Sequence, residues 1–140
     1  MIKIILAALI VFYLITRLYQ IGQLPQTVYW DEASIGYNAF SVTVDGKDEW
    51  GDFLPLHFRA FGEFKLPVYI YSVVPFVATL GLNAEAVRLP AVIFGLFTLI
   101  GCYLIGRKLF NNQVGLLTIL FLIISPWFLL FSRVGYEVSA

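Results

Sequence analysis

Charged residues are scarce in this chain, and their scarcity excludes most classes of soluble protein. Of its 140 residues, 13% are charged, 60% are hydrophobic and 17% are aromatic. Soluble domains usually carry about a quarter charged residues, so this balance places the chain in a membrane. Nine basic and nine acidic residues cancel, and no basic stripe is present to neutralise nucleic-acid phosphates. Nucleic acid is therefore excluded as a partner.

Cysteine is almost absent, which excludes a further set of structures. The single cysteine, Cys102, lies in an apolar run. It cannot form an intrachain disulfide, and no group of Cys and His has the spacing of zinc ligands. The sequence also lacks a Gly-rich phosphate loop and a nucleophile elbow. A Rossmann-type nucleotide-sugar transferase is thus unsupported, and we expect neither a metal nor a cofactor.

What the sequence has instead is three long apolar runs, which predict membrane-spanning helices at residues 2–21, 87–106 and 114–131. A spanning helix needs about 20 mostly apolar residues. The first run reaches that length if Arg17 extends its guanidinium group to the membrane surface.

Charge decides how a fourth apolar segment, residues 67–82, is interpreted. It is only about 16 residues long and contains Pro75, and such a run is more often interfacial, re-entrant or buried than spanning. Lys3 favours a cytoplasmic N-terminus. If residues 67–82 crossed the membrane, the basic loop 107–113 would lie on the outer side, against the positive-inside rule. We therefore expect 67–82 to form a helix beside the membrane.

Residues 22–86 are expected to form a long outer loop between the first two spans. Residues 34–44 predict a short amphipathic helix, and residues 45–51 predict a turn because Asp-Gly and a second glycine allow positive φ angles. The loop up to residue 65 contains seven of the nine acidic residues: Asp31, Glu32, Asp45, Asp48, Glu49, Asp52 and Glu63. The acids of the turn match no complete calcium loop, so a solvated turn is favoured there.

Asp31 and Glu32 are the first candidates for chemistry. They come about ten residues after the first apolar run, and a carboxylate at the bilayer surface can act as general base on an acceptor hydroxyl. The alternative is a helix start, where acids cap free N–H groups and complement the helix dipole. By themselves, these two residues fit the helix start better.

Three cations could bind an anion near the membrane surface: Lys65, Arg88 and Arg59. Lysine can hold a lipid phosphate as a point charge, but each of the three can equally be a snorkelling anchor. His57 is expected to be structural, because no carboxylate is spaced to orient it.

After the last apolar run, Arg133 and Glu137 are four residues apart. On a helix they would form an ion pair. The functional alternative is that Glu137 brings a second acid to the face that holds Asp31.

The order of these segments resembles one family. After the first span come WDEASIGYNAFSV, DGKDEWGDFLPLHFRAFGEFKLPVYIY, GLNAEAVRLPAVIFGLFTLIGCYLIGRKLF and SPWFLLFSRVGYE. From about Leu24 to Glu137, this order resembles the bacterial and archaeal dolichyl-phosphate-mannose–protein mannosyltransferase-like glycosyltransferases, which are related to the lipid A aminoarabinose transferase. The resemblance implies an all-α membrane protein. Its fold would be a GT-C-type N-terminal module with three transmembrane helices and juxtamembrane helices in the long first outer loop.

The resemblance also implies roles for individual residues. Asp31, with Glu32 beside it, would be the general base toward the acceptor, and Lys65 would contact the carrier phosphate. Glu137 would be the acid of the second outer loop. Two positions depart from the family pattern, since Leu66 stands where proline is usual and Glu137 where aspartate is commoner.

The function that follows is sugar transfer from a polyprenyl-phosphate donor to an unknown acceptor, which could be a protein, a lipid or a glycan. The resemblance places the reaction on the non-cytoplasmic face of a multi-pass cell-membrane protein, with inversion at the sugar and no metal. Arg88 and Arg59 would assist Lys65 in holding the phosphate.

Family members run to several hundred residues, so residues 1–140 are expected to be the N-terminal part of a longer enzyme. The alternative is a non-catalytic membrane fragment or a small helical membrane interaction protein. A transporter fragment is disfavoured, because no Gly/Pro-broken repeat recurs in two halves.

Overall fold

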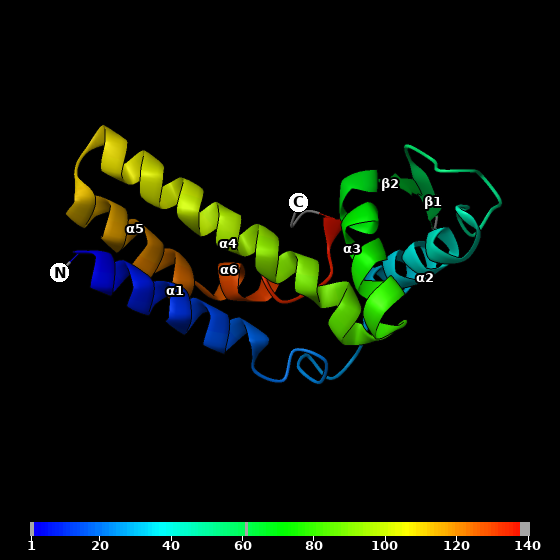
Figure 1. The fold of residues 1–140 in the computed structure, drawn as a ribbon, viewed down its shortest axis with the longest axis horizontal. Coiled ribbons are helices and arrows are strands. Elements are labelled where there is room, and N and C mark those ends of the chain that lie inside the picture. The colour runs from blue at the N-terminus through cyan, green and yellow to red at the C-terminus, as the bar shows by residue number, and fades with distance from the viewer. Residues whose placement is uncertain (1, 61, 138–140) are drawn as a thin grey trace.

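The computed structural model describes residues 2–60 and 62–137, which form a helical bundle joined to a smaller cap (Figure 1). The bundle contains α1 (Ile2–Leu18), α4 (Ala84–Leu109), α5 (Asn112–Ile124) and α6 (Pro126–Phe131). The cap contains α2 (Trp30–Asp45), β1 (Phe58–Ala60), β2 (Glu63–Lys65) and α3 (Pro67–Leu80). The structure is thus mostly helical, as predicted, with a short antiparallel hairpin that the sequence analysis did not predict.

The bundle depends on glycines at its helix crossings. A side chain at Gly95 of α4 would meet the hydroxyl of Tyr13 on α1, which donates a hydrogen bond to the carbonyl of Val92 at 2.8 Å. Further along α4, a Cβ atom at Gly106 would lie 3.1 Å from the Cα atom of Gly115 on α5. Small residues at such crossings let membrane helices approach closely.

The helices differ in length from the predicted spans. Within the described residues, one helix, α4, is long and apolar enough to cross a membrane by length and composition. The helix α1 ends at Leu18, and the predicted span 114–131 is divided at Ser125. Proline has no N–H group and favours an extended residue before it, and Ser125 before Pro126 has a ψ angle of 126°.

Arg17 corrects one expectation from the sequence. Its side chain does not reach the surface, because the residue is 1% exposed and points into the bundle. It donates hydrogen bonds to the carbonyl of Ile123 at 2.9 Å and to the hydroxyl of Ser132 at 3.1 Å. A carbonyl left over where α5 stops needs a donor in a membrane interior, and Arg17 provides it.

Of the two alternatives for Arg133 and Glu137, the ion pair on a helix is not formed among the described residues. The helix α6 ends at Phe131, before both residues. Arg133 instead donates to backbone carbonyls at and after the end of α1, those of Thr16, Tyr19 and Leu24. A cation is favoured at a helix C-terminus, where carbonyls lack intrahelical partners.

In the cap, the predicted turn is confirmed and the predicted helices are present. The helix α2 begins at Trp30, earlier than the predicted 34, and ends at Asp45; the residue after it, Gly46, has a φ angle of 74°. Gly51 also has a positive φ angle, 94°. The helix α3 occupies the predicted segment 67–82. Its place beside the membrane stays a prediction.

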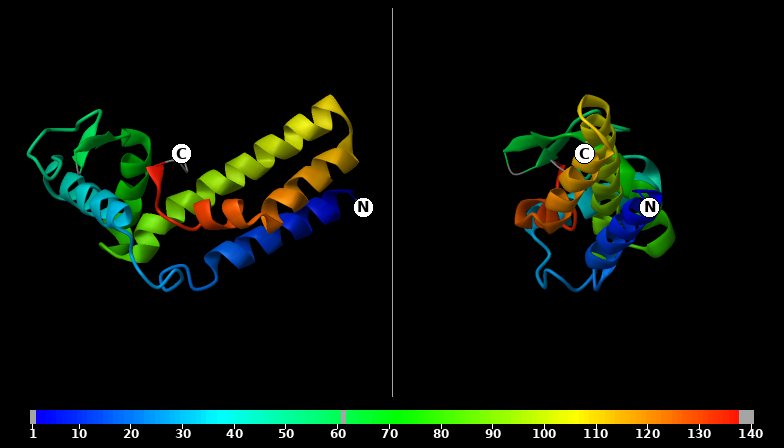
Figure 2. Two further views of the ribbon diagram at one scale, coloured as in Figure 1. Left: turned by 180° about the vertical axis from the view of Figure 1, so that it is seen from behind. Right: turned by 90° about the vertical axis from the view of Figure 1, so that its left-hand side faces the viewer.

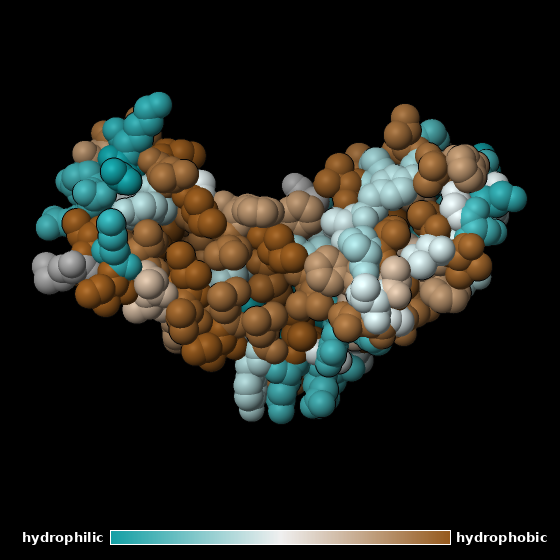
Figure 3. Space-filling view, in the orientation of Figure 1, coloured by the Kyte–Doolittle hydropathy of each residue, from teal (hydrophilic) through white to brown (hydrophobic). Residues whose placement is uncertain are grey.

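The outside of the bundle is apolar. Figure 3 shows a brown, hydrophobic surface over the bundle, with hydrophilic residues gathered at the far left end and at the lower edge. Apolar side chains more than half exposed include Ile4, Val11, Ile15, Phe97, Ile105 and Phe121. Exposed apolar surface of this kind must contact lipid or other helices.

The basic residues at the end of α4 and the acid Asp31 lie in opposite parts of the molecule. Figures 1 and 2 place the N-terminus and the α4–α5 connection at one end, and α2, α3 and the hairpin at the other. The last turn of α4 contributes Arg107 and Lys108 to the first end. The acid Asp31, in the first turn of α2, belongs to the opposite part of the molecule.

A buried ion pair joins the cap to the bundle. Glu32 of α2 and Arg88 of α4 are 1% and 0% exposed, and the Nε atom of Arg88 lies 2.7 Å from the Oε1 atom of Glu32. Arg88 also donates to the carbonyls of Ile21, Pro25 and Thr27 in the α1–α2 connection. One guanidinium group thus holds three segments together.

We expect Gly95→Ala to destabilise the fold by about 1–3 kcal/mol, because the added methyl group displaces Tyr13 from α4. Unfolding in detergent, followed by circular dichroism, measures this. The matched control is Gly101→Ala on the same helix, where no atom lies within 4 Å. That change should be neutral or stabilising, since alanine favours helix by about 1 kcal/mol. Equal losses for the two variants would contradict the described crossing.

We expect Glu32→Gln to lower the free energy of unfolding by about 3–5 kcal/mol, because it leaves the buried guanidinium of Arg88 without its counter-charge. Glu85→Gln, an exposed acid in the first turn of α4, should cost less than about 1 kcal/mol. The same unfolding measurement compares them. If both cost the same, the ion pair does not hold the cap to the bundle.

Candidate functional site

The candidate site lies where three distant parts of the chain meet. The first turn of α2 contributes Asp31, the end of β2 contributes Lys65, and the segment after α6 contributes Tyr136 and Glu137. All four lie around one narrow gap together with Ile35, which lies one helical turn after Asp31. Three of these four residues, Asp31, Lys65 and Glu137, are the site residues that the resemblance implied.

Asp31 and Lys65 form a direct ion pair. The Nζ atom of Lys65 lies 2.7 Å from the Oδ1 atom of Asp31, with side chains 1% and 16% exposed. A charge-assisted hydrogen bond of this length is among the stronger kinds. The pair brings a carboxylate and an ammonium group to a place that is mostly shielded from solvent.

The hairpin determines where Lys65 points. In the antiparallel register, Lys65 lies opposite Phe58, which is fully buried against Tyr71. Successive side chains alternate between the two faces of a strand, so the neighbouring Phe64 is 61% exposed while Lys65 is 1% exposed. The buried phenylalanine thereby fixes the strand that turns Lys65 toward α2.

Glu137 fixes the chain just after Lys65. Its Oε2 atom accepts a hydrogen bond from the backbone N–H of Leu66 at 2.8 Å. Leu66 is the residue before α3, and Pro67 begins the helix. A carboxylate at a helix N-terminus satisfies an N–H group without an intrahelical partner and is favoured by the helix dipole. Glu137 thus holds the β2–α3 junction at Leu66, the position where the family resemblance leads one to expect proline.

Tyr136 is the site residue that sequence reasoning missed. Its side chain hydrogen-bonds to Asp31, and this bond, burial and the charges of Asp31 and Glu137 raise the pKa of Tyr136. As one of eight tyrosines, it had no distinguishing spacing from Asp31. One feature of the sequence indicated that Tyr136 belongs to the site: it directly precedes the acid Glu137, at the end of the segment that resembles the family.

Glu32 and Arg88 lie next to the site but bind each other. Both oxygens of Glu32 accept from Arg88, and the same carboxylate accepts from the N–H groups of Tyr29 and Gly135. Within the described chain, hydrogen bonds to Glu32 and to the carbonyls of the α1–α2 connection account for all five N–H groups of Arg88. A phosphate contact by Arg88 stays a prediction and requires one of these bonds to be exchanged.

The two adjacent acids have different partners in the structure, although both lie in the first turn of α2. Glu32 is the third residue of α2 and completes a capping box with Tyr29, so the helix-start alternative holds for Glu32. Asp31 turns away from that network to Lys65. The general-base role predicted for Asp31 is untested, and the same holds for Glu32.

The remaining candidates lie apart from this cluster. Arg59 is exposed on β1, and its part in phosphate binding stays a prediction. His57 is exposed and contacts Phe64 edge to face at 5.1 Å. In the turn after α2, Asp48 accepts hydrogen bonds from the N–H groups of Trp50 and Asp52. No three His, Cys, Asp or Glu side chains of the described residues are grouped to hold a metal ion.

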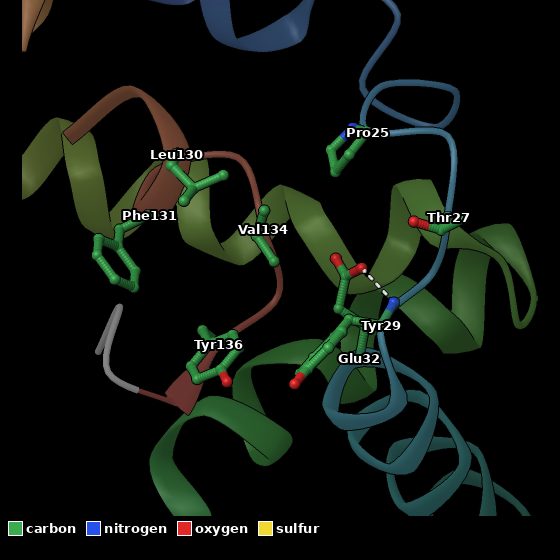
Figure 4. A pocket seen from close by; sticks show the side chains of 8 residues that line it. All are labelled: Pro25, Thr27, Tyr29, Glu32, Leu130, Phe131, Val134 and Tyr136. Carbon is green, nitrogen blue, oxygen red and sulfur yellow. Dashed lines mark hydrogen bonds between the residues drawn. The ribbon is translucent and has the colours of Figure 1, made fainter. Parts of the chain in front are cut away.

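An apolar cavity of about 360 Å³ adjoins the site (Figure 4). Tyr136 lines both this cavity and the Asp31 cluster. Across it, the ring of Tyr29 lies 6.3 Å from that of Tyr136. The lining residues come from the α1–α2 connection, the start of α2, α6 and the segment after it: Pro25, Thr27, Tyr29, Glu32, Leu130, Phe131, Val134 and Tyr136.

Comparison with known proteins identifies the family. Neither the curated proteins nor the solved structures give a match. A family model described as dolichyl-phosphate-mannose-protein mannosyltransferase matches residues 65–138, a segment that runs from Lys65 through α3, α4, α5 and α6 and includes Glu137. Because this match covers more than half of the chain, the protein belongs to the dolichyl-phosphate-mannose-protein mannosyltransferase family of membrane glycosyltransferases.

Proposed function

We propose that this protein transfers a sugar from a polyprenyl-phosphate donor to an acceptor hydroxyl on the non-cytoplasmic face of the membrane. The observation that carries the proposal is the 2.7 Å contact between Asp31 and Lys65. It brings together a carboxylate that can accept a proton and a cation that can hold a phosphate. These are the two charges that such a transfer requires.

In the proposed reaction, the acceptor oxygen attacks the anomeric carbon of the donor sugar while Asp31 removes its proton. The bond from the anomeric carbon to the phosphate oxygen breaks, and the polyprenyl phosphate leaves with the bonding electrons. Lys65 stabilises the negative charge that develops on that phosphate. Attack on the side opposite the leaving group inverts the configuration at the anomeric carbon.

The ion pair between Asp31 and Lys65 has a place in this scheme. The ammonium group of Lys65 can donate three hydrogen bonds. The phosphate of the polyprenyl-phosphate sugar can therefore replace one partner of Lys65 while another partner is kept. As the phosphate draws Lys65 toward itself, an oxygen of Asp31 becomes available to the acceptor. Tyr136 and Glu137 act as positioning residues, because one hydrogen-bonds to Asp31 and the other holds the Leu66 backbone.

The apolar cavity beside the site offers a place for the carrier. We assign to it the first isoprene units of the polyprenyl chain. Its lining is mostly apolar, and Leu130 and Phe131 come from a helix whose outer surface is also apolar. A polyprenyl phosphate needs its phosphate at a cation and its chain in an apolar environment, and Tyr136 lies at the boundary between the two.

The same proposal includes a membrane topology of three spans, formed by α1, α4 and α5 together with α6. With its break at Ser125, the last of these still extends from residue 112 to 131, about the length of a membrane span. The positive-inside rule places the end with Arg107 and Lys108 in the cytoplasm. Asp31 would then face the non-cytoplasmic side.

We expect Asp31→Asn in the full-length protein to reduce kcat for sugar transfer about 10²–10⁴-fold, because the acceptor loses its general base. Lys65→Met should reduce activity and raise KM for the donor, since the phosphate loses its cation. Transfer from radiolabelled polyprenyl-phosphate mannose measures both. Asp45→Asn and Lys47→Met, matched changes at exposed positions, should keep wild-type rates. Wild-type transfer by a folded Asp31→Asn variant would refute the base assignment.

We expect cysteines at the two ends of the bundle to react from opposite sides of the membrane. In a Cys102→Ser background, Lys47→Cys in the cap should react with a membrane-impermeant maleimide in intact cells. Lys108→Cys, in the last turn of α4, should react only after permeabilisation. Labelling of both positions from one side would rule out the three-span topology.

A further inference from the structure

A second cavity lies on another face of α2, and the proposed transfer chemistry makes no use of it. Its volume is about 370 Å³, near the lower end of the range for ligand pockets, about 300–1,000 Å³. One wall follows α2 at helical spacing, and the other comes from the turn after α2 and from β1. The lining residues are Trp30, Ala33, Ser34, Tyr37, Glu49, Trp50 and Ala60.

Three aromatic side chains of this cavity are open to solvent. Trp30, Tyr37 and Trp50 are 60%, 52% and 63% exposed. Trp50 is held in place, because its indole N–H donates to the carbonyl of Arg59 at 3.3 Å. Trp30 lies edge-on to Tyr29 with ring centroids 5.5 Å apart. The cavity thus presents three aromatic rings to whatever enters it, with Trp50 held by a hydrogen bond.

Its polar groups are few and held in position. Ser34 is 8% exposed, and its hydroxyl oxygen has no hydrogen-bond partner in the described part of the chain. Burial of a hydroxyl without a partner is unfavourable, so such a group calls for an explanation. The oxygen itself is buried, so the Ser34 side chain has to rotate toward the cavity that this residue lines before a ligand can complete the missing bond.

The second polar group is the carboxylate of Glu49. The fully buried Asn38 donates to the Oε1 atom of Glu49 at 3.0 Å and accepts from the Glu49 N–H at 3.2 Å. Both bonds fix the acid at the rim of the cavity. Its negative charge repels a phosphate, so this cavity does not suit the charged end of the donor.

The chemistry that fits this lining is a pyranose sugar. One face of such a ring presents C–H groups, which are attracted to the negative face of an aromatic ring. Its edge presents hydroxyl groups, which can donate to the carboxylate of Glu49 and bond to the Ser34 hydroxyl. An aromatic belt at a membrane surface would explain exposed tryptophans, but it would leave the buried Ser34 hydroxyl and the fixed Glu49 without a purpose.

We propose that this cavity binds a pyranose ring of a glycan acceptor. Trp30 precedes Asp31 directly, and Ser34 follows Asp31 by three residues, a spacing that puts Cβ atoms about 5–6 Å apart on a helix. A sugar in the cavity therefore lies about one helical turn from the proposed base. The assignment as acceptor rests on the proposed function, whereas sugar binding by itself does not.

Binding is tested on the full chain in lipid nanodiscs, without sugar-headed detergents, which would compete. The probe is methyl α-D-mannopyranoside, and saturation-transfer NMR titration gives its Kd. We expect Trp50→Leu to weaken binding about tenfold, because it removes a stacking surface, and Ser34→Ala about three- to tenfold. Trp127→Leu is the matched control, since Trp127 is also exposed, at 71%, and lies on α6 outside the cavity. It should leave Kd unchanged.

A stability measurement separates a binding role of Ser34 from a structural one. Ser34→Ala removes a buried hydroxyl that has no partner among the described residues, so its melting temperature should equal or exceed that of the wild type. Weaker sugar binding together with unreduced stability supports the proposal. Unchanged sugar binding in both Ser34→Ala and Trp50→Leu would overturn it, and so would binding of a Ser/Thr-containing peptide but of no pyranoside.

Asp31→Asn distinguishes this proposal from the proposed function, because Asp31 does not line the cavity. The variant should lose transfer but bind the pyranoside with the wild-type Kd. Loss of transfer without any pyranoside binding in the wild type would overturn the sugar site and leave the proposed function standing. Pyranoside binding that depends on Ser34 and Trp50, with full transfer by Asp31→Asn, would support the sugar site and refute the base assignment.

Discussion

The buried ion pair between Glu32 of α2 and Arg88 of α4 joins the cap to the bundle. Two charges with almost no exposure require complete hydrogen bonding, and the chain supplies it from two further segments, the α1–α2 connection and the segment after α6. The α1–α2 connection gives three carbonyls to Arg88, while Tyr29 and Gly135 each give an N–H group to Glu32. The cap, the bundle and the segment after α6 are thereby fixed at one point, with Asp31 one residue from it and Glu137 two residues after Gly135.

Neighbouring residues of α2 point to different sides of the helix. Successive residues of an α-helix point about 100° apart, so Glu32 faces inward while Asp31 faces Lys65. Trp30, Ser34 and Tyr37 face the second cavity. Two turns of α2 thus contain the buried carboxylate of Glu32, the carboxylate of Asp31 in the candidate site and the residues that line the second cavity. This arrangement would allow donor and acceptor to approach one base from different sides.

The bundle shows how a membrane protein accommodates an interrupted helix. The chain stops being helical at Ser125 because of Pro126, which leaves the carbonyl of Ile123 to be satisfied. Arg17 donates to it from α1, and the arginine itself lies near the rings of Tyr13 and Phe128, at 4.9 and 5.7 Å. Beyond the break, Arg133 caps the end of α1. Both arginines join α1 to the segment that carries Tyr136 and Glu137.

The sequence alone determined the local features, because these depend on residues close together in the chain. Apolar runs predicted the helices, the glycines of residues 45–51 predicted the turn, and the order of motifs indicated the family and the set of Asp31, Lys65 and Glu137. The partner of each buried charge, by contrast, follows from how the folded chain packs. Arg17 and Ile123 are 106 residues apart, and Glu32 and Arg88 are 56 apart, so no local pattern relates them. The role of Tyr136 and the cavity beside Ser34 were hidden for the same reason: both arise where distant segments meet.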